Sequence, residues 1–369
     1  MDLRNYIADK KQLQRSLLTF LDQEDTEGEE NYQNLTNLIH HQKFGQNKDE
    51  LTAFLHLISQ ISANHHRTNN FHTKIDRVIS ILDNEIKENF INLELFHIFK
   101  RNKRILLYLI QNNLIFMDEN IAKVLSKLKY RKLRYIHYFY PELKGFLTDP
   151  KLKKKIEEDI SKYDDETFKR LREQGENDQE VCELIRNDSL NDFLSHSNDD
   201  VSNSIFETNM YLIKNKTSLI DYSAFFGSVE IFKYLLSNND QITPELWFYA
   251  IHGQNLEIIK LLQEKKVRCR DHSFVTVLEE SFKCHNGEVT KYVKDNLTTI
   301  RANQETDVLS RSTKYYDYEN FPNNLNNQFA FCYLCQADYI SLLRKIVNLS
   351  KRNFELNMSI SSIPNFFLY

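Results

Sequence analysis

The cysteines are the first residues whose types and spacing could do chemistry. Cys332 and Cys335 are separated by two residues, and Cys284 and His285 lie upstream of them. Two thiolates at this spacing can share one zinc ion. The upstream pair lacks the spacing of a second zinc-binding half, and the apolar residues around Cys332 follow the inner stripe of a helix. We therefore expect buried thiols, with no metal and no cofactor.

Two histidine pairs are the second candidates: His40 with His41, and His65 with His66. Neighbouring residues on a helix point about 100° apart, so the two rings of a pair cannot face one site as residues four apart can. We expect these histidines to be solvated or to cap helices.

A basic segment at residues 100–134 is the third candidate. It contains ten Lys and Arg residues against Asp118 and Glu119, with tyrosines between them. Such a segment could bind RNA or an anionic membrane surface. Its apolar residues also recur at helical spacing, which favours a helix pair with a lysine-rich outer face. Nucleic-acid or membrane binding therefore stays an alternative, and it depends on four residues: Lys127, Lys129, Arg131 and Lys132.

Motifs of catalytic chemistry are absent from the sequence. There is no GxxxxGK phosphate loop, no GxSxG nucleophile turn and no HExxH metal pair, and seven glycines leave few places for one. We therefore expect a protein that is not an enzyme.

The composition favours a helical chain. Apolar residues make up 41%, while seven Gly and five Pro are few for a fold rich in β-turns. The net charge of −4 gives no general case for nucleic acid. No stretch approaches the 18 apolar residues of a membrane span, residues 1–19 lack a signal-peptide core, and the cysteine count is odd. These features predict an intracellular, cytoplasmic protein without a transmembrane segment.

A helical pattern recurs in the C-terminal half, at residues 219–236, 246–262 and 278–296, with a weaker copy at 329–347. Each strong copy has a small residue, a glycine-containing break, Glu, an aliphatic residue, Lys and another aliphatic residue. We expect the glycines Gly227, Gly253 and Gly287 to supply positive φ where the first helix ends. The aliphatic residues Ile231, Leu235, Ile258 and Leu262 would form the buried stripe of the second helices.

These residues resemble the ankyrin repeat. Thr243, Pro244, Leu246, Ala250, Gly253, Glu257 and Lys260 match its Thr-Pro-Leu, Ala, Gly, Glu and Lys positions. The period is shorter than the usual 33, and the turn histidine is missing. From about residue 96 onward the chain is similar to a large protist family of divergent ankyrin proteins with a helical leader. That family has no established activity to carry over, so the resemblance implies a fold and a binding role.

The sequence thus predicts an all-α protein in which a helical domain precedes a divergent ankyrin-type solenoid. The expected divisions are an N-terminal helical domain at 1–150, a charged helix and linker at 151–180, repeats at 181–297, a Tyr/Asn-rich insertion at 298–328, and a terminal repeat with its tail at 329–369. Whether 298–328 is a loop or a degraded repeat stays open.

The expected function is that of a non-enzymatic scaffold that binds a partner protein of unknown identity in the concave groove of the array. In ankyrin proteins the residues just before the glycine face this groove. The resemblance places five candidate partner-binding residues there: Phe225, Ile251, His252, His285 and Gln336. Paired phenylalanines in a helix also suit the core between repeats.

Overall fold

The computed structural model describes residues 3–23, 28–68, 70–126, 132–177, 179–196, 204–206, 216–238, 242–298, 305–322 and 328–350. The described chain is helical apart from one antiparallel ribbon, which confirms the all-α prediction. In that ribbon β1 (Ser204–Phe206) pairs with β2 (Lys216–Ser218), and Ile205 stands opposite Thr217. No helix in these ranges is long and apolar enough to cross a membrane.

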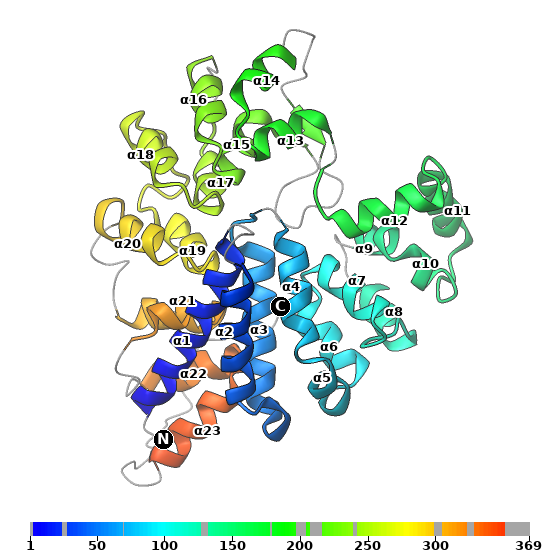
Figure 1. Ribbon diagram of the computed structural model, residues 1–369, viewed down its shortest axis with the longest axis vertical. Helices are drawn as coiled ribbons and strands as arrows, with labels where there is room; N and C mark the ends of the chain where they lie inside the picture. Colours follow the sequence, from blue (N-terminus) through cyan, green and yellow to red (C-terminus); the bar gives the residue numbers. More distant parts are fainter. Residues whose placement is uncertain are drawn as a thin grey trace.

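The N-terminal helices form a bundle around α3 (Figure 1). Their bounds are α1 Leu3–Asp22, α2 Gly28–His41, α3 Lys48–Asn64, α4 Phe71–Ser80, α5 Asp83–Asn89, α6 Asn92–Phe99, α7 Lys103–Gln111, α8 Glu119–Ser126, α9 Lys132–Tyr138 and α10 Tyr140–Leu143, with the 3₁₀ turn η1 at Phe44–Gln46. Asn47 caps α3 by accepting from the Glu50 backbone N–H. Leucine and isoleucine residues three and four apart, such as Leu51, Leu55 and Ile58, are fully buried.

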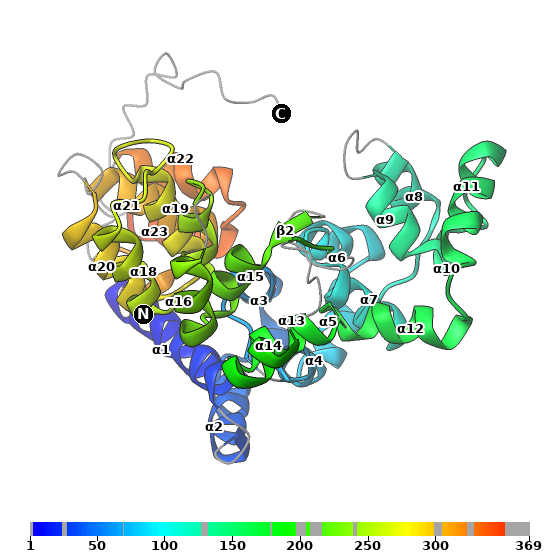
Figure 2. The same ribbon diagram turned by 90° about the horizontal axis from the view of Figure 1, so that it is seen from above.

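Two charged helices follow, α11 (Pro150–Ile160) and α12 (Asp165–Gln174). Figure 2 shows them at the opposite end of the molecule from the C-terminal helices. Ile156 of α11 packs with Ile136 and Tyr140 in a small separate core. α12 ends at Gly175, whose φ of 71° stops the helix and leads the chain to the later helical pairs.

The C-terminal half is a series of helical pairs. They are α13 (Glu180–Arg186) with α14 (Leu190–His196), α15 (Leu219–Phe226) with α16 (Val229–Ser237), α17 (Leu246–His252) with α18 (Leu256–Glu264), and α19 (Val275–Lys283) with α20 (Gly287–Asn296). The first helices touch in chain order, α13 to α15 to α17 to α19. The segment left open by the sequence contains α21 (Glu305–Tyr315) and the 3₁₀ turn η3 (Tyr318–Asn320), and α21 packs between α19 and α22 (Gln328–Gln336). The last helix is α23 (Ile340–Ser350).

The breaks between paired helices differ from the expected glycine geometry. Gly227 has a φ of 69°, as predicted, but Gly253 has a φ of −69° and its neighbour Gln254 takes the positive angle of 53°. In the next unit His285, with φ 56°, takes that role, and Gly287 begins α20. Gly253 is required for another reason: a Cβ there would lie 2.0 Å from the carbonyl oxygen of Ala224. Consecutive units therefore approach backbone to backbone at this position.

The last helices belong to the N-terminal core. Leu334, Tyr339 and Leu342 are buried in the same apolar cluster as α1 and α3. The Tyr6 hydroxyl lies 3.1 Å from Ser341 Oγ and donates to Glu50 at 3.0 Å. The chain thus returns to its start, and the last helix lies beside the first (Figure 1). A second core, from Val181 to Val293, holds the helical pairs together.

Candidate functional site

Three of the predicted partner-binding residues meet on the facing helices α15 and α17. The rings of Phe225 and His252 stack with centroids 5.3 Å apart and planes 23° apart. Ile251 is fully buried, and Phe225 and His252 are 3% and 1% exposed. The three residues therefore lie on neighbouring helices, as the repeat pattern predicts, but their side chains are buried and do not line an open groove.

The cover over this cluster is the chain that follows α3. The Arg67 guanidinium lies 5.0 Å from the centre of the Phe225 ring and 5.6 Å from that of Phe226, and it forms an ion pair with Glu176. The Asn64 backbone also acts on the buried His252 ring, where it opposes the lowering of the ring's pKa by burial. A cation above an aromatic face is attracted by the ring quadrupole. The N-terminal domain thus occupies the position in which a partner was expected.

His65 is central to this contact. Its Nδ1 lies 2.6 Å from the Cys284 carbonyl oxygen, and its Nε2 lies 2.7 Å from Asp22 Oδ1. Gln254 Nε2 is 2.8 Å from the same Nδ1. His65 is the C-cap residue of α3, but the expectation of a solvated ring is wrong, because the ring is buried between two parts of the chain. His40 and His41, at the end of α2, are exposed as expected.

The other two predicted partner residues lie apart from this cluster. His285 is buried in the turn after α19, with Nδ1 3.0 Å from the Lys283 carbonyl and Nε2 2.9 Å from that of Tyr315. Burial lowers its pKa, and the charge of Asp317 opposes this effect. Gln336 is exposed at the end of α22. His285 lines a polar cavity of about 620 Å³ with His65 and Gln254, and Gln336 does not.

The basic alternative falls mostly outside the described residues. Lys127, Lys129 and Arg131 are not among them, and Lys132 begins α9 with its side chain not described. Two other cations of the segment face inward. Arg104 bonds Asp76 at 2.5 Å and the Glu173 carbonyl at 2.7 Å, and Lys103 lies 5.2 Å from the centre of the Tyr138 ring.

The cysteine expectation is only partly met. Cys284 is fully buried, but Cys332 is half-buried and Cys335 is exposed. The expectation is wrong for Cys335 because it lies on the outer side of α22, whereas Leu334 points into the core. Within the described ranges, neither Cys332 nor Cys335 belongs to a group of three possible metal ligands.

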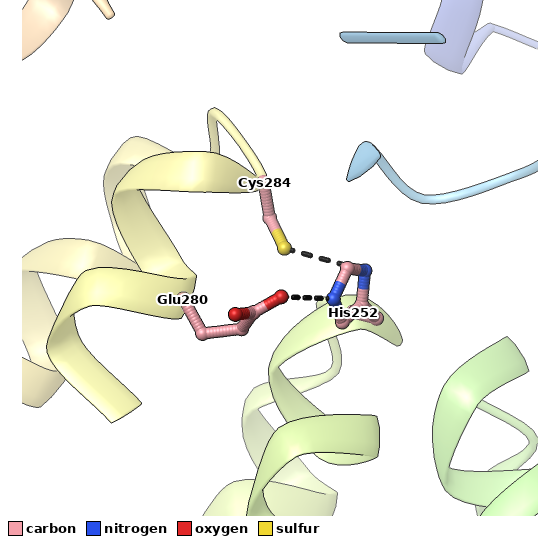
Figure 3. Close-up of side chains that lie close together, drawn as sticks. All are labelled: His252, Glu280 and Cys284. Carbon is pink, nitrogen blue, oxygen red and sulfur yellow. Dashed lines mark hydrogen bonds and ion pairs between the residues drawn. The ribbon is translucent and has the colours of Figure 1, made fainter. Parts of the chain in front are cut away.

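A different cluster, missed from the sequence, joins α17 to α19. His252 Nε2 lies 2.5 Å from Glu280 Oε1, and Cys284 Sγ lies 3.4 Å from His252 Nδ1 (Figure 3). Glu280 and Cys284 are four residues apart, so they share one face of α19. One signal was available: the repeat pattern places His252 and Glu280 on the first helices of successive units, and these helices pack against each other.

Burial sets the protonation of this cluster. It raises the pKa of the Cys284 thiol well above its ordinary value and lowers the pKa of His252. Burial alone would raise the pKa of Glu280, but its interaction with His252 and the positive charge of Lys283 lower it overall. Lys283 Nζ lies 2.8 Å from the same Glu280 oxygen. The carboxylate therefore stays ionised in an almost closed space.

Glu280 also lines an open cavity of about 290 Å³ between α17 and α19. Aromatic and apolar side chains supply much of its wall, including Trp247, Phe248 and Val277. Arg270 is exposed at its edge and forms an ion pair with Glu245. The cavity thus combines apolar walls with a few charged groups, as ligand and partner sites commonly do.

Similarity to known proteins does not indicate a function for these residues. No family model, no curated protein and no solved structure matches the chain. A functional proposal therefore rests on the contacts among α15, α17 and α19, on the segment that covers them, and on the cavity beside them.

Proposed function

We propose that the chain is a non-enzymatic, cytoplasmic scaffold that binds a partner protein through a divergent ankyrin array. The array would be a solenoid whose units are the helical pairs from α13 to α20, with α22 and α23 as its terminal unit. The chain-order contacts of the first helices support this proposal, because a solenoid unit contacts only its neighbours. The five free thiols fit a reducing compartment.

Contacts between successive units give the proposal further support. Asp188 of the first unit accepts from the backbone N–H groups of Glu230 and Ile231, both at 3.0 Å, and so caps α16 of the next. Asn255 donates to the Gly227 carbonyl at 3.3 Å while it caps its own helix α18. The units on either side of α15–α16 therefore both complete hydrogen bonds of that pair, as stacked repeats do.

The observation that carries the binding role is the aromatic cavity between α17 and α19. Phe248 is partly exposed on its wall, and Arg270 is exposed at its edge. Aromatic and arginine side chains provide most of the binding energy at protein interfaces. The proposed occupant is an apolar side chain of a partner segment lying across two units. The cluster of Phe225, Ile251 and His252 is buried, so a partner would reach it only by displacing residues 64–67.

Crosslinking and affinity capture from native cell extract would test this role. The variant carries Phe248→Ala and Arg270→Ala, and the matched control carries Phe146→Ala, an exposed aromatic residue in the N-terminal half. Circular dichroism first establishes that both fold. We expect one or more proteins to be captured by wild type and control and lost from the cavity variant.

Equal capture by all three proteins would remove the support for the cavity. Recovery of RNA or anionic lipid, falling steeply with salt, would favour the alternative based on Lys127, Lys129, Arg131 and Lys132. Changing those four residues to Glu would then abolish the recovery.

A further inference from the structure

The side chains of His252, Glu280 and Cys284 form a compact set of donor atoms. One possible ligand atom from each residue lies within 4.8 Å of the other two. They are the only such group of three among the residues that the structure describes. In Figure 3 the Glu280 carboxylate and the Cys284 sulfur approach the imidazole from α19, and the imidazole projects from the end of α17. The helices are two rigid elements, so the donors are held in place.

The donor types select a class of metal ion. Thiolate and imidazole ligands suit zinc and similar transition metals, whereas calcium and magnesium prefer oxygen ligands alone. Three protein ligands of the kinds His, Glu and Cys leave one tetrahedral position of zinc open. We propose that His252, Glu280 and Cys284 bind a transition-metal ion of the zinc class, with water from the neighbouring cavity as the fourth ligand.

The surroundings of His252 resemble those of a metal-binding histidine. Its ring stacks on Phe225, with centroids 5.3 Å apart, and its centroid lies 4.9 Å from that of Phe248, and these contacts restrict rotation. The Asn64 backbone also interacts with the ring and opposes the lowering of its pKa by burial. Metal-ligating histidines generally have such an outer partner, because it fixes the tautomer and the direction of the free nitrogen.

An ion can reach this site without the helices separating. The Glu280 side chain is 12% exposed and lines the cavity between α17 and α19. On binding, the Cys284 thiol loses its proton to solvent and the sulfur forms a bond to the metal. The ammonium group of Lys283, which pairs with Glu280 at 2.8 Å, moves away from the oxygen that coordinates.

The consequence is a clamp between two successive helical pairs. His252 belongs to the pair α17–α18, while Glu280 and Cys284 belong to α19 and its C-cap. The Cys284 carbonyl is the group that His65 contacts. A bound ion would therefore stiffen the array at the place where the N-terminal domain docks.

The test uses the full chain after removal of bound metal, titrated with Co²⁺ and followed by thiolate-to-cobalt charge-transfer absorption. Cys332→Ser and Cys335→Ser are introduced first, because these accessible thiols could bind cobalt independently. We expect one equivalent of Co²⁺, a charge-transfer band, displacement by Zn²⁺, and a higher melting temperature with Zn²⁺.

Variants then assign the ligands. Cys284→Ser should abolish the band, and Glu280→Gln should keep the band but weaken Co²⁺ binding by about tenfold or more. Cys182→Ser, at a buried thiol in the same core, should leave the charge-transfer band and the affinity for Co²⁺ unchanged. The proposal is overturned if the Cys332/Cys335-substituted protein shows no stoichiometric band, or if the band survives Cys284→Ser. The protein in the first of these results keeps all three proposed ligands. The absence of a band there cannot be explained by misfolding of a ligand variant.

Discussion

The Nδ1 atom of His65 lies 2.6 Å from the carbonyl oxygen of Cys284, a residue 219 positions later in the chain. This contact joins the end of α3 to the end of α19, so the N-terminal domain and the helical pairs share buried polar groups. Arg67, two residues after His65, places its guanidinium over the rings of Phe225 and Phe226. The N-terminal domain is therefore packed along the helical pairs and buries the face on which a partner was expected.

Arg67→Ala should destabilise the whole chain. It would remove the cation above two aromatic rings and the ion-pair partner of Glu176, whose side chain is only 14% exposed. Glu176 would keep only its weaker interactions with His72, at 3.5 Å, and Arg186. Because breaking a buried ion pair is strongly destabilising, we expect the free energy of unfolding to fall by about 3 kcal/mol. Urea denaturation followed by circular dichroism measures this change.

Arg15→Ala is the matched control. Arg15 also pairs with a distant part of the chain, Glu319, but its side chain is 67% exposed. An exposed ion pair contributes less than about 1 kcal/mol. Equal losses for the two variants would contradict the assigned role of residues 64–67.

Gly253→Ala should be far more damaging than Gly287→Ala. A Cβ at Gly253 would lie 2.0 Å from the Ala224 carbonyl oxygen, and both backbones would have to separate. At Gly287 a Cβ would have no atom within 4 Å. We expect a loss of at least about 2 kcal/mol for the first and less than about 0.5 kcal/mol for the second. Similar melting temperatures would show that the two units do not approach as closely as described.

The sequence predicted the helical class and the second helices of the units well, because their signals are local. Ile258 and Leu262, four apart on α18, and Ile231 on α16 are fully buried as predicted. The prediction is wrong for Leu235, which is only half-buried, because the buried face of α16 is formed by Ile231, Phe232 and Leu236. The breaks were predicted less well. Three residues separate α17 from α18, whereas two separate α15 from α16. With this extra residue the positive φ falls on Gln254 instead of Gly253, and only the three-dimensional structure shows that shift.

The candidate site depended on long-range contacts that periodicity does not encode. The pattern grouped Phe225, Ile251 and His252 correctly on adjacent helices, but it gave no sign that Arg67 covers them. Likewise, Glu280 and Cys284 have helical spacing in the sequence, yet their relation to His252 depends on the packing of α17 against α19. Whether Phe225, Ile251, His252, His285 or Gln336 contacts a partner stays a prediction.

Ile231→Asp or Ile258→Asp should unfold the helical pairs. Each side chain is fully buried in the second core, so a carboxylate introduced there would lose its hydration in apolar surroundings. We expect a loss above about 4 kcal/mol and a lower melting temperature by circular dichroism. Lys260→Ala, at an exposed position of α18, the helix that carries Ile258, should change the melt little. An unchanged melt for either Asp variant would contradict the repeat assignment.

Stability should fall between pH 6.5 and pH 4 partly because of His56. Its ring stacks on Tyr316 at 5.1 Å, and burial lowers its pKa from 6.5 to about 4, with Lys100 adding to the effect and Asp338 opposing it. Between these values the unfolded chain binds a proton that the folded chain does not. Each pH unit of acidification then lowers the free energy of unfolding by up to about 1.4 kcal/mol.

His56→Phe keeps the stacking, so urea denaturation across this range should show a shallower decline. Part of the decline should remain, because burial also lowers the pKa of His66 to about 4. A variant as acid-sensitive as wild type would show that His56 is protonated equally in both states.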